Sequence, residues 1–282
     1  MQTKLRIDKR HKISLKDFDP ADVLGCDKES CIADTEELGR KLYELQEWFY
    51  AAQTHSVLIV LQGMDTSGKD GTISHAFTAL NPQGCAVASF KVPTPDEASH
   101  DFLWRVHKQT PTKGMITIFN RSHYEDVLVT RVHDLIDKKT CEKRYDNIRD
   151  FEKLLTQNHT IVLKFFLNIS KSEQEERLLA REQDPSKAWK LSAGDWQERK
   201  LWDDYQDAYE DAISETAAED APWYIIPSNH KWVRNYIIAK ILVDELQKYR
   251  EGWEETLKEI GENRLNELKE MRAVKNGNGN GK

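Results

Sequence analysis

The sequence has no apolar run approaching the ~20 residues that a membrane-spanning helix needs, which argues against a membrane protein. The first residues, MQTKLRIDKRHK, do not have the pattern of a signal peptide. An excess of positive charge is also absent, because the net charge is -7, and this argues against a general affinity for nucleic acid. These absences favour a polar cytoplasmic enzyme with neither a membrane nor a nucleic acid as its partner.

Cysteine is scarce in this chain. The four cysteines lack the spacing of a zinc site and are too few, in 282 residues, to suggest a disulfide framework. We therefore expect reduced thiols with structural roles at Cys26, Cys31, Cys85 and Cys141. The chain is long enough for one large α/β domain with a sizeable core, and it contains no internal repeat.

Short apolar runs that alternate with helix-like stretches predict the fold class. The runs predict five strands at Val57–Leu61, Cys85–Phe90, Met115–Asn120, Ile161–Leu167 and Trp223–Ile226. The helix-like stretches are 71–80, 96–110, 124–136, 141–157, 171–182 and 230–250. Strands that alternate with helices predict an α/β fold in which a five-stranded parallel sheet is flanked by helices.

The chain divides into three predicted parts. A first helix is expected to start near Asp34, with Glu37 in the position of a capping box. A strand-free segment rich in charge and tryptophan is expected to form a helical lid, and the NGNGNGK end is expected to be disordered. The parts are an N-terminal extension (1–33), a main domain (34–252, with the lid at about 171–218) and a C-terminal helix with a tail (253–282).

The most informative stretch is VLIVLQGMDTSGKDGT, residues 57–72, which has the pattern G-x-x-x-x-G-K between a strand and a helix. Glycines let backbone N–H groups turn inward, the helix start adds positive potential, and Lys69 brings a cation to a phosphoryl oxygen. The alternative is a glycine-rich turn that only connects two elements. The pattern predicts a phosphate cradle at Gly63, Met64, Asp65, Thr66, Ser67, Gly68, Lys69, Asp70 and Gly71.

One position of the cradle departs from the usual pattern. Asp70 stands where a Ser or Thr hydroxyl normally follows the lysine and contacts magnesium. A metal ion must then be held by other groups, and Asp65 inside the loop is the nearest candidate.

A second motif, FNRSHYED at 119–126, follows the predicted third strand, so it should face the cradle at the carboxyl edge of the sheet. Arg121 could grip a phosphoryl group with its planar fork. Either Glu125 or Asp126 could join Asp65 around a metal ion. The alternatives are a surface ion pair for Arg121 and a hydrogen-bonding loop role for His123.

The acceptor site has weaker signals. The loop VPTPD follows the second predicted strand, and Lys91 just before it could meet the acceptor's α-phosphate. Phe102 and Trp104 share helical spacing with Val106, which favours a place in the core over stacking on a base.

Together these motifs resemble the polyphosphate kinase 2 family. The resemblance rests on GMDTSGKDGT, FKVPTPDEASHDFLWRVHK, FNRSHYEDVLVTRVH, RLLAREQDPSKAWKLSAGDWQERKLWDDY and PWYIIPSNHKWVRN, in this order over most of residues 35–250. The aspartate after the lysine is the family's own pattern. The HDFLWRVH and SHYEDVLV segments most resemble the class III branch, which phosphorylates both AMP and ADP.

The resemblance implies a P-loop kinase fold like that of thymidylate kinase, with a helical lid. It also implies reversible phosphoryl transfer from inorganic polyphosphate to AMP and ADP, giving ADP and ATP, with magnesium or alternatively manganese. The matching positions are Asp65 and Lys69 in the cradle, Arg121, Glu125 and Asp126 in the second motif, and Arg177 and Arg181 in the lid.

The chemistry assigns roles to these residues. An acceptor phosphate with a second pKa of about 6 is largely ionised at neutral pH, so charge stabilisation matters more than a base. Catalysis is therefore expected to rest on Asp65, Lys69, Arg121, Asp126 and Arg181, with Asp65 and either Asp126 or Glu125 holding the metal. The substrate anions are expected to contact Lys91, Asn120, Arg121, Arg131, Arg177, Arg181 and Lys190.

Two other functions compete with this one. An ATP-dependent nucleoside monophosphate kinase would share the cradle, but Asp70 does not fit it. A non-catalytic protein that binds nucleotide or polyphosphate would not need the catalytic set. Lid cations could instead pair with acidic residues on solvated helix faces, although Arg177 and Arg181 share one face. A homo-oligomer is expected, with the helices at 34–52 and 253–272 as an interface or as helices packed on their own subunit.

Overall fold

The computed structural model describes residues 4–184 and 193–277, and its centre is one sheet with the strand order β1-β6-β5-β2-β4-β3. The strands β2 to β6 run parallel, and β1 pairs antiparallel with β6. Their bounds are β1 Arg6–Ile7, β2 Ser56–Gln62, β3 Cys85–Ser89, β4 Ile116–Asn120, β5 Thr160–Asn168 and β6 Trp223–Pro227.

The sheet has six strands in the described chain, so the predicted number of five was wrong. The additional strand is β1, in which Arg6 lies opposite Tyr224 and Ile7 lies opposite Trp223. Leu5 and Ile7 are buried, so these apolar side chains attach the N-terminal extension to the edge of the sheet. A strand of two residues is too short to show the alternation by which strands are predicted.

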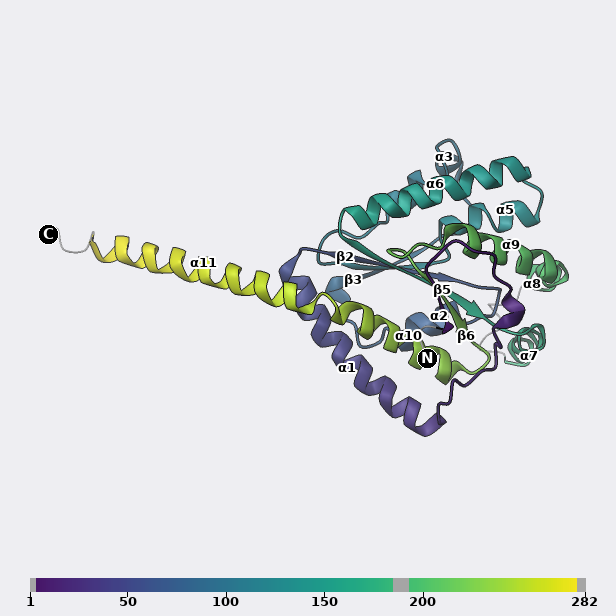
Figure 1. Cartoon of the computed structure of the whole chain (residues 1–282), viewed down its shortest axis with the longest axis horizontal. Helices are drawn as coiled ribbons and strands as arrows, with labels where there is room; N and C mark the ends of the chain where they lie inside the picture. The colour runs from purple at the N-terminus through teal and green to yellow at the C-terminus, as the bar shows by residue number, and fades with distance from the viewer. Residues whose placement is uncertain (1–3, 185–192, 278–282) are drawn as a thin grey trace.

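Helices cover both faces of the sheet, as the alternating pattern predicts (Figure 1). Every residue of β2 and β5 is buried, which explains their nearly continuous apolar sequences. One face carries α4 (Trp104–His107), α5 (Val129–Val132), α6 (Lys138–Gln157) and α9 (Trp202–Thr216). The other face carries α1 (Lys28–Ala52), α2 (Lys69–Ala76), α10 (Lys231–Gln247) and the start of α11 (Arg250–Gly277).

Several element boundaries differ from the prediction. The helix α1 begins at Lys28 rather than near Asp34, because the side chain of Asp27 accepts a hydrogen bond from Ser30 N and caps the helix there. The predicted helix at 96–110 is instead two short helices, α3 (Pro95–Ala98) and α4. A 3₁₀ turn, η4 (His123–Asp126), and the short α5 replace the predicted helix at 124–136.

The segment predicted to be a lid is helical and contains no strand in its described residues. It comprises α7 (Lys171–Glu182), α8 (Ala193–Glu198), a 3₁₀ turn at Arg199–Leu201, and α9. Buried Ala208, Tyr209 and Ile213 anchor α9 in the core, so this helix belongs to the body. Lys190, a predicted polyphosphate contact, lies outside the described residues.

The helix α11 leaves the body beside α1 and extends away from it (Figure 1). Trp253 near its start is completely buried, whereas residues 262–273 are all exposed. The predicted disordered end is residues 276–282: residues 276 and 277 are helical, as the last residues of α11, so the prediction was wrong there, and residues 278–282 lie outside the described residues. Within the described ranges, no helix combines the length and apolar character needed to cross a membrane.

Candidate active site

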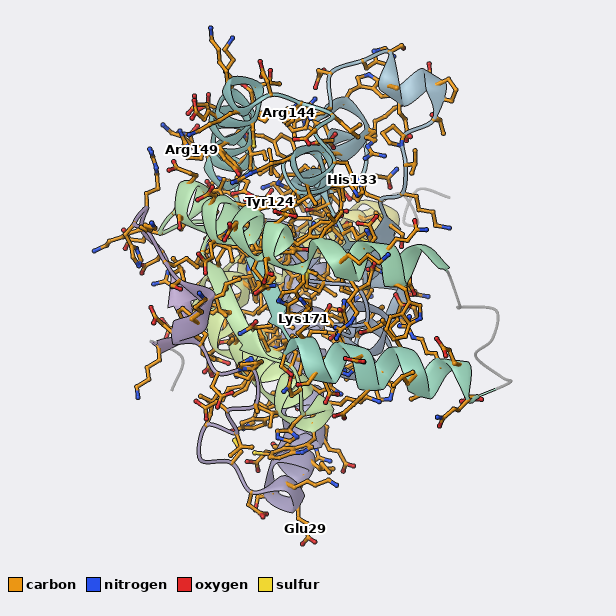
Figure 2. The ribbon with its side chains drawn as sticks, turned by 90° about the vertical axis from the view of Figure 1, so that its right-hand side faces the viewer. Glu29, Tyr124, His133, Arg144, Arg149 and Lys171 are labelled. Atoms are coloured by element: carbon orange, nitrogen blue, oxygen red, sulfur yellow. The ribbon has the colours of Figure 1, made fainter. Side chains whose placement is uncertain are left out.

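The phosphate cradle and the second motif meet at the carboxyl edge of the sheet, as predicted. The cradle joins β2 to α2, and Arg121 directly follows β4, which pairs with β2. The backbone N–H of Arg121 donates to the carbonyl oxygen of Leu61 at 3.1 Å. Figure 2 faces the side of the molecule that carries α7 and α8, with Lys171 at the start of α7 near the centre of the view. Open α/β sheets bind ligands at this edge.

The cradle needs glycine at both of its ends. Gly63 has a φ of +150°, and a Cβ there would lie 2.7 Å from the Ser67 hydroxyl and 2.8 Å from the carbonyl oxygen of Leu167. Gly68 has a φ of +103° and precedes the first residue of α2. The loop therefore turns back on the sheet and delivers its backbone N–H groups to the start of a helix, which is an anion-binding geometry.

Lys69 is buried inside the loop with neutral partners. Its ammonium donates to the carbonyl oxygens of Gly63 at 2.7 Å and Met64 at 3.2 Å. Burial, and then the nearby charge of Arg121, lower the pKa of Lys69 from 10.5 to about 8. An ammonium held in this way gains from the arrival of an anion, which suits phosphate binding.

Asp70 is tied to the second motif. The side-chain amide of Asn120 donates to its carboxylate at 2.8 Å. Asn120 was predicted to bind substrate, and the structure places it at the cradle through this hydrogen bond. Asp70 thus connects the start of α2 to the end of β4, in the position where a conventional loop has a metal-binding hydroxyl.

Arg121 lies between two carboxylates. Its guanidinium contacts Asp65 at 2.7 Å and Glu125 at 3.1 Å, and its own backbone has a φ of +62°. Burial disfavours its charge, but Glu125 and Asp65 outweigh burial and raise the pKa of Arg121. The left-handed backbone is uncommon for a residue with a side chain and is typical of functional sites.

Asp126 points to a different set of cations. Its carboxylate lies 3.7 Å from Arg105 and 3.8 Å from Arg144, and burial raises its pKa. One of its oxygens, Oδ2, is buried without a hydrogen-bond partner in the described structure. The turn η4 thus sends Glu125 to Arg121 and Asp65, and sends Asp126 towards Arg105. A metal-binding role for Asp126 stays a prediction.

The carboxylates suit a magnesium ion that is shared with substrate. No group of three His, Cys, Asp or Glu side chains that could hold a metal occurs in the described ranges. Asp65 and Glu125 nevertheless flank the same guanidinium at the mouth of the cradle. Magnesium is commonly held by one or two carboxylates together with water and substrate phosphates, so these two residues fit it.

The predicted lid cations have different partners. Arg177 donates to the carbonyl oxygens of Thr66 at 2.9 Å and Ser228 at 2.6 Å, and it pairs with Glu173 at 2.6 Å. It therefore holds the backbone of the cradle loop to α7 and to the end of β6. Arg181 lies 3.7 Å from Asp195 in α8.

Two further predicted cations lie at the margins of the site. Arg131 pairs with Asp211 of α9 at 2.7 Å. The side chain of Lys91 is exposed, and its backbone oxygen accepts a hydrogen bond from Arg105 at 2.7 Å. Direct substrate contacts by these two residues remain predictions.

Trp104 differs from its predicted place in the core. The ring of His100 stacks on it at 3.9 Å between centroids, and the ammonium of Lys108 lies 3.4 Å from its ring centre. Residues on either side of α4 in the sequence thus cover the tryptophan. Phe102 packs against the core, as predicted.

The structure adds residues that the sequence argument missed. The side-chain amide of Gln174 donates to the backbone oxygen of Asp65 at 3.1 Å, and the Tyr205 hydroxyl donates to Glu198 at 2.6 Å. Gln174, Arg177 and Arg181 follow helical spacing, a signal that could have identified Gln174. The pocket is lined by Gly63, Met64, Asp65, Arg121, Glu125, Leu128, Val129, Gln174, Glu198, Tyr205 and Tyr209.

Comparisons with known proteins agree with this geometry. The family model described as Polyphosphate kinase 2 matches residues 25–252. An AMP/ADP-polyphosphate phosphotransferase of Meiothermus ruber is 50% identical over 246 residues, which cover 86% of this chain and 92% of the relative. An ADP-polyphosphate phosphotransferase of Rhodopseudomonas palustris is 44% identical over 228 residues, 77% of this chain and 79% of the relative.

A solved structure is also similar. The crystal structure of polyphosphate kinase 2 from Arthrobacter aurescens TC1 has a TM-score of 0.84 and 45% identity, and it covers 87% of this chain and 88% of that one. The cradle, Arg121 and the helices α7 to α9 all fall within the residues that the family model matches. The chain belongs to the polyphosphate kinase 2 family.

Proposed function

We propose that this protein transfers the terminal phosphoryl group of inorganic polyphosphate to AMP and ADP, giving ADP and ATP in a reversible reaction. The observation that carries the proposal is the convergence of Lys69, Arg121 and the Asp65–Glu125 carboxylates at one edge of the sheet. The names of both relatives support polyphosphate as the donor; the Meiothermus ruber protein is named for AMP and ADP as acceptors, and the Rhodopseudomonas palustris protein for ADP.

In the proposed reaction, the site acts mainly by positioning charged groups around the reacting phosphates. The acceptor phosphate is already largely ionised at neutral pH, since its second pKa is about 6. The loop N–H groups and Lys69 would hold the donor's phosphates, and Arg121 would neutralise charge on the transferring group. Asp65 and Glu125 would hold magnesium, which when bound draws the phosphates together and offsets their charge.

The remaining predicted residues would act around this centre. We propose that Arg181 approaches the donor from the lid and that Asp126 acts with Arg105 and Arg144. Lys91 and Asn120 would bind on the acceptor side. Arg131, Arg177 and Lys190 complete the set of cations proposed to interact with the polyanion.

A nucleotide separation tests the proposal directly. Purified protein would be mixed with magnesium, long-chain polyphosphate and AMP in the absence of ATP, and the nucleotides separated over time. ADP followed by ATP is the expected result, and ADP alone would contradict the use of both acceptors. If only ATP serves as donor, the protein is a nucleoside monophosphate kinase, whereas no turnover with either donor would favour a binding protein.

We also propose that the protein acts in the cytoplasm as a homo-oligomer. All four cysteines are free, which suits a reducing compartment. The exposed part of α11 carries Leu265, Leu268 and Met271, and Trp253 near the start of this helix is buried against the body. Helices gain most of their stability from packing, so a second copy would stabilise this exposed segment. Light scattering after size-exclusion chromatography would measure the number of subunits.

A further inference from the structure

A buried arginine from α10 lies against the outer side of the phosphate cradle. Arg234 is 2% exposed, and its Nη1 atom lies 3.5 Å from the carbonyl oxygen of Ser67. A Cβ on Gly68 would lie 1.8 Å from the same nitrogen, and a Cβ on Gly71 would lie 3.2 Å from Nη2. The guanidinium therefore occupies the space that side chains at positions 68 and 71 would need.

The partners of Arg234 do not neutralise its charge. Its Nε and Nη2 atoms donate to the side-chain oxygen of Asn235 at 3.1 and 2.9 Å, and Asn235 is neutral. Across the described ranges, no carboxylate lies within ion-pair distance of Arg234. Burial, followed by the neighbouring charge of Arg177, lowers the pKa of Arg234 to about 10.

The other cations that contact the cradle or its mouth divide into two kinds. Arg121 pairs with Asp65 and Glu125, and Arg177 pairs with Glu173. Lys69 has only carbonyl partners, but it lies inside the loop where a phosphate would contact it. Arg234 also has only neutral partners, but its guanidinium meets the loop at the Ser67 carbonyl oxygen and beside Gly68, away from the carbonyl groups that Lys69 contacts.

We propose that Arg234 is a positioning residue whose buried charge stabilises the polyphosphate bound in the cradle, and that the bound phosphate is the counter-charge that the empty protein lacks. This inference rests on the proposed function. An unpaired buried charge is costly, and its field is screened little by solvent. A phosphate on the opposite side of the loop would therefore lower the cost of Arg234, and Arg234 would in turn raise the affinity for phosphate.

A purely structural role predicts something different. If Arg234 only filled the space beside Gly68 and Gly71, its loss would destabilise the empty protein and leave the phosphate affinity of the folded fraction unchanged. If its charge matters, an apolar residue of similar length should leave the empty protein equally or more stable, because a buried charge has been removed. Phosphate binding should then weaken.

The test compares Arg234→Met and Arg234→Lys with the wild-type protein. Arg40→Met is the matched control, because Arg40 is an exposed arginine that pairs with Glu37 on α1. Thermal unfolding is measured with and without inorganic tripolyphosphate in metal-free buffer, and the dissociation constant is measured by calorimetry at 0.1 M and 0.5 M salt. Steady-state turnover with long-chain polyphosphate and ADP completes the set.

We expect Arg234→Met to keep or raise the melting temperature of the empty protein and to weaken tripolyphosphate binding roughly tenfold to a hundredfold. The KM for polyphosphate should rise more than kcat falls. Most of the loss should persist at 0.5 M salt, because a buried charge is screened little. Arg234→Lys should bind within about threefold of wild type, since it keeps the charge, and Arg40→Met should match wild type.

The results that would contradict the inference can be told apart from one another. A lower melting temperature for Arg234→Met with unchanged tripolyphosphate affinity would assign a structural role and overturn the inference. If Arg234→Met does not fold, Arg234→Lys decides: a folded lysine variant whose tripolyphosphate affinity falls about tenfold or more would show that the charge is not what matters. Wild-type protein that neither binds tripolyphosphate nor turns over polyphosphate and ADP with magnesium would overturn the proposed function together with the inference, whereas binding that is insensitive to position 234 overturns the inference alone.

Discussion

Two lysines are buried in the described part of the chain, and their surroundings differ in kind. Lys164 of β5 lies in the core, where its ammonium contacts Glu152 at 2.5 Å, the carbonyl oxygen of Thr216 at 2.9 Å and the Tyr124 hydroxyl at 3.2 Å. Lys69 in the cradle contacts only two loop carbonyls in the described structure. The core lysine therefore pairs directly with a carboxylate, whereas the cradle lysine makes direct contacts only with neutral carbonyl groups.

The difference separates a charge that supports the fold from one that is kept for a ligand. A buried charge with a carboxylate and hydrogen bonds is satisfied in the empty protein. A buried charge with neutral partners keeps most of its attraction for an incoming anion. The two regions are also connected, because Glu152 contacts His123 at 3.2 Å and the Tyr124 hydroxyl at 2.8 Å, in the loop that carries Arg121.

Replacing the cradle lysine should have the largest effect on activity. Lys69→Met should lower turnover with polyphosphate at least about 10³-fold, because a positioned cation is lost from the transferring phosphates. The protein should remain folded, since no buried carboxylate loses its partner. Single-turnover rates and circular dichroism measure the two effects, and a variant that retains a tenth of wild-type activity would contradict the comparison.

Arg121→Ala should be nearly as damaging. Turnover should fall about 10³-fold, because the arginine that would stabilise charge in the transition state is removed and Asp65 and Glu125 lose their common cation. The measurement is kcat at saturating polyphosphate and ADP. Full activity in this variant would exclude Arg121 from the chemistry, and Arg40→Ala provides a surface control.

Replacing the core lysine should affect stability instead. Lys164→Met should cost about 3–5 kcal/mol of unfolding free energy, because Glu152 is left as an unpaired buried charge. The double variant Lys164→Met/Glu152→Gln should recover most of that loss. Urea denaturation measures both, and kcat of the folded protein should change far less than in Lys69→Met. A stable single variant with no turnover would reverse the assignment.

The smallest expected effect is the change of unfolding free energy with pH that arises from Lys69. Lys69 has a folded pKa of about 8, below its value of 10.5 in an unfolded chain. Below pH 8 both states carry the proton, and the folded state bears the full cost of the buried charge. Between pH 8 and 10.5 the unfolded state binds more protons, so unfolding free energy should rise by up to about 3 kcal/mol.

This rise is measured as a difference between wild type and Lys69→Met, which lacks the titrating group, at pH 7.5 and pH 10. The same titration should lower kcat/KM for polyphosphate above about pH 8, because only the ammonium form attracts phosphate. If the difference in unfolding free energy between the two proteins does not change with pH, Lys69 is charged over the whole range.

The sequence predicted the sheet well where the signal is local. The five parallel strands were placed to within one residue at each end, because buried β-branched runs such as VLIV are distinctive. The start of α1 was missed because KESCIAD has no apolar periodicity, and the cap at Asp27 was not recognised. The strand β1 was missed because only its pairing with β6 defines it.

The site shows the same division. Asp65 and Lys69 lie in one short sequence motif and Arg121 lies in another. The parallel pairing of β2 and β4 brings these two motifs together. Arg234 and Tyr209 come from distant helices, so tertiary packing alone places them at the cradle. The choice between Glu125 and Asp126 was left open because adjacent residues in a tight turn point in different directions, and only the backbone of η4 decides which meets Arg121.

The path of α11 has a practical consequence. The indole N–H of Trp253 donates to His55 at 3.2 Å, so this helix starts near the amino end of β2, whereas the cradle follows the carboxyl end of the same strand. A strand of 7 residues separates those ends by roughly 23 Å. A solid support or a fused reporter attached through the exposed segment 262–273 would therefore leave the mouth of the cradle open to a long polymer.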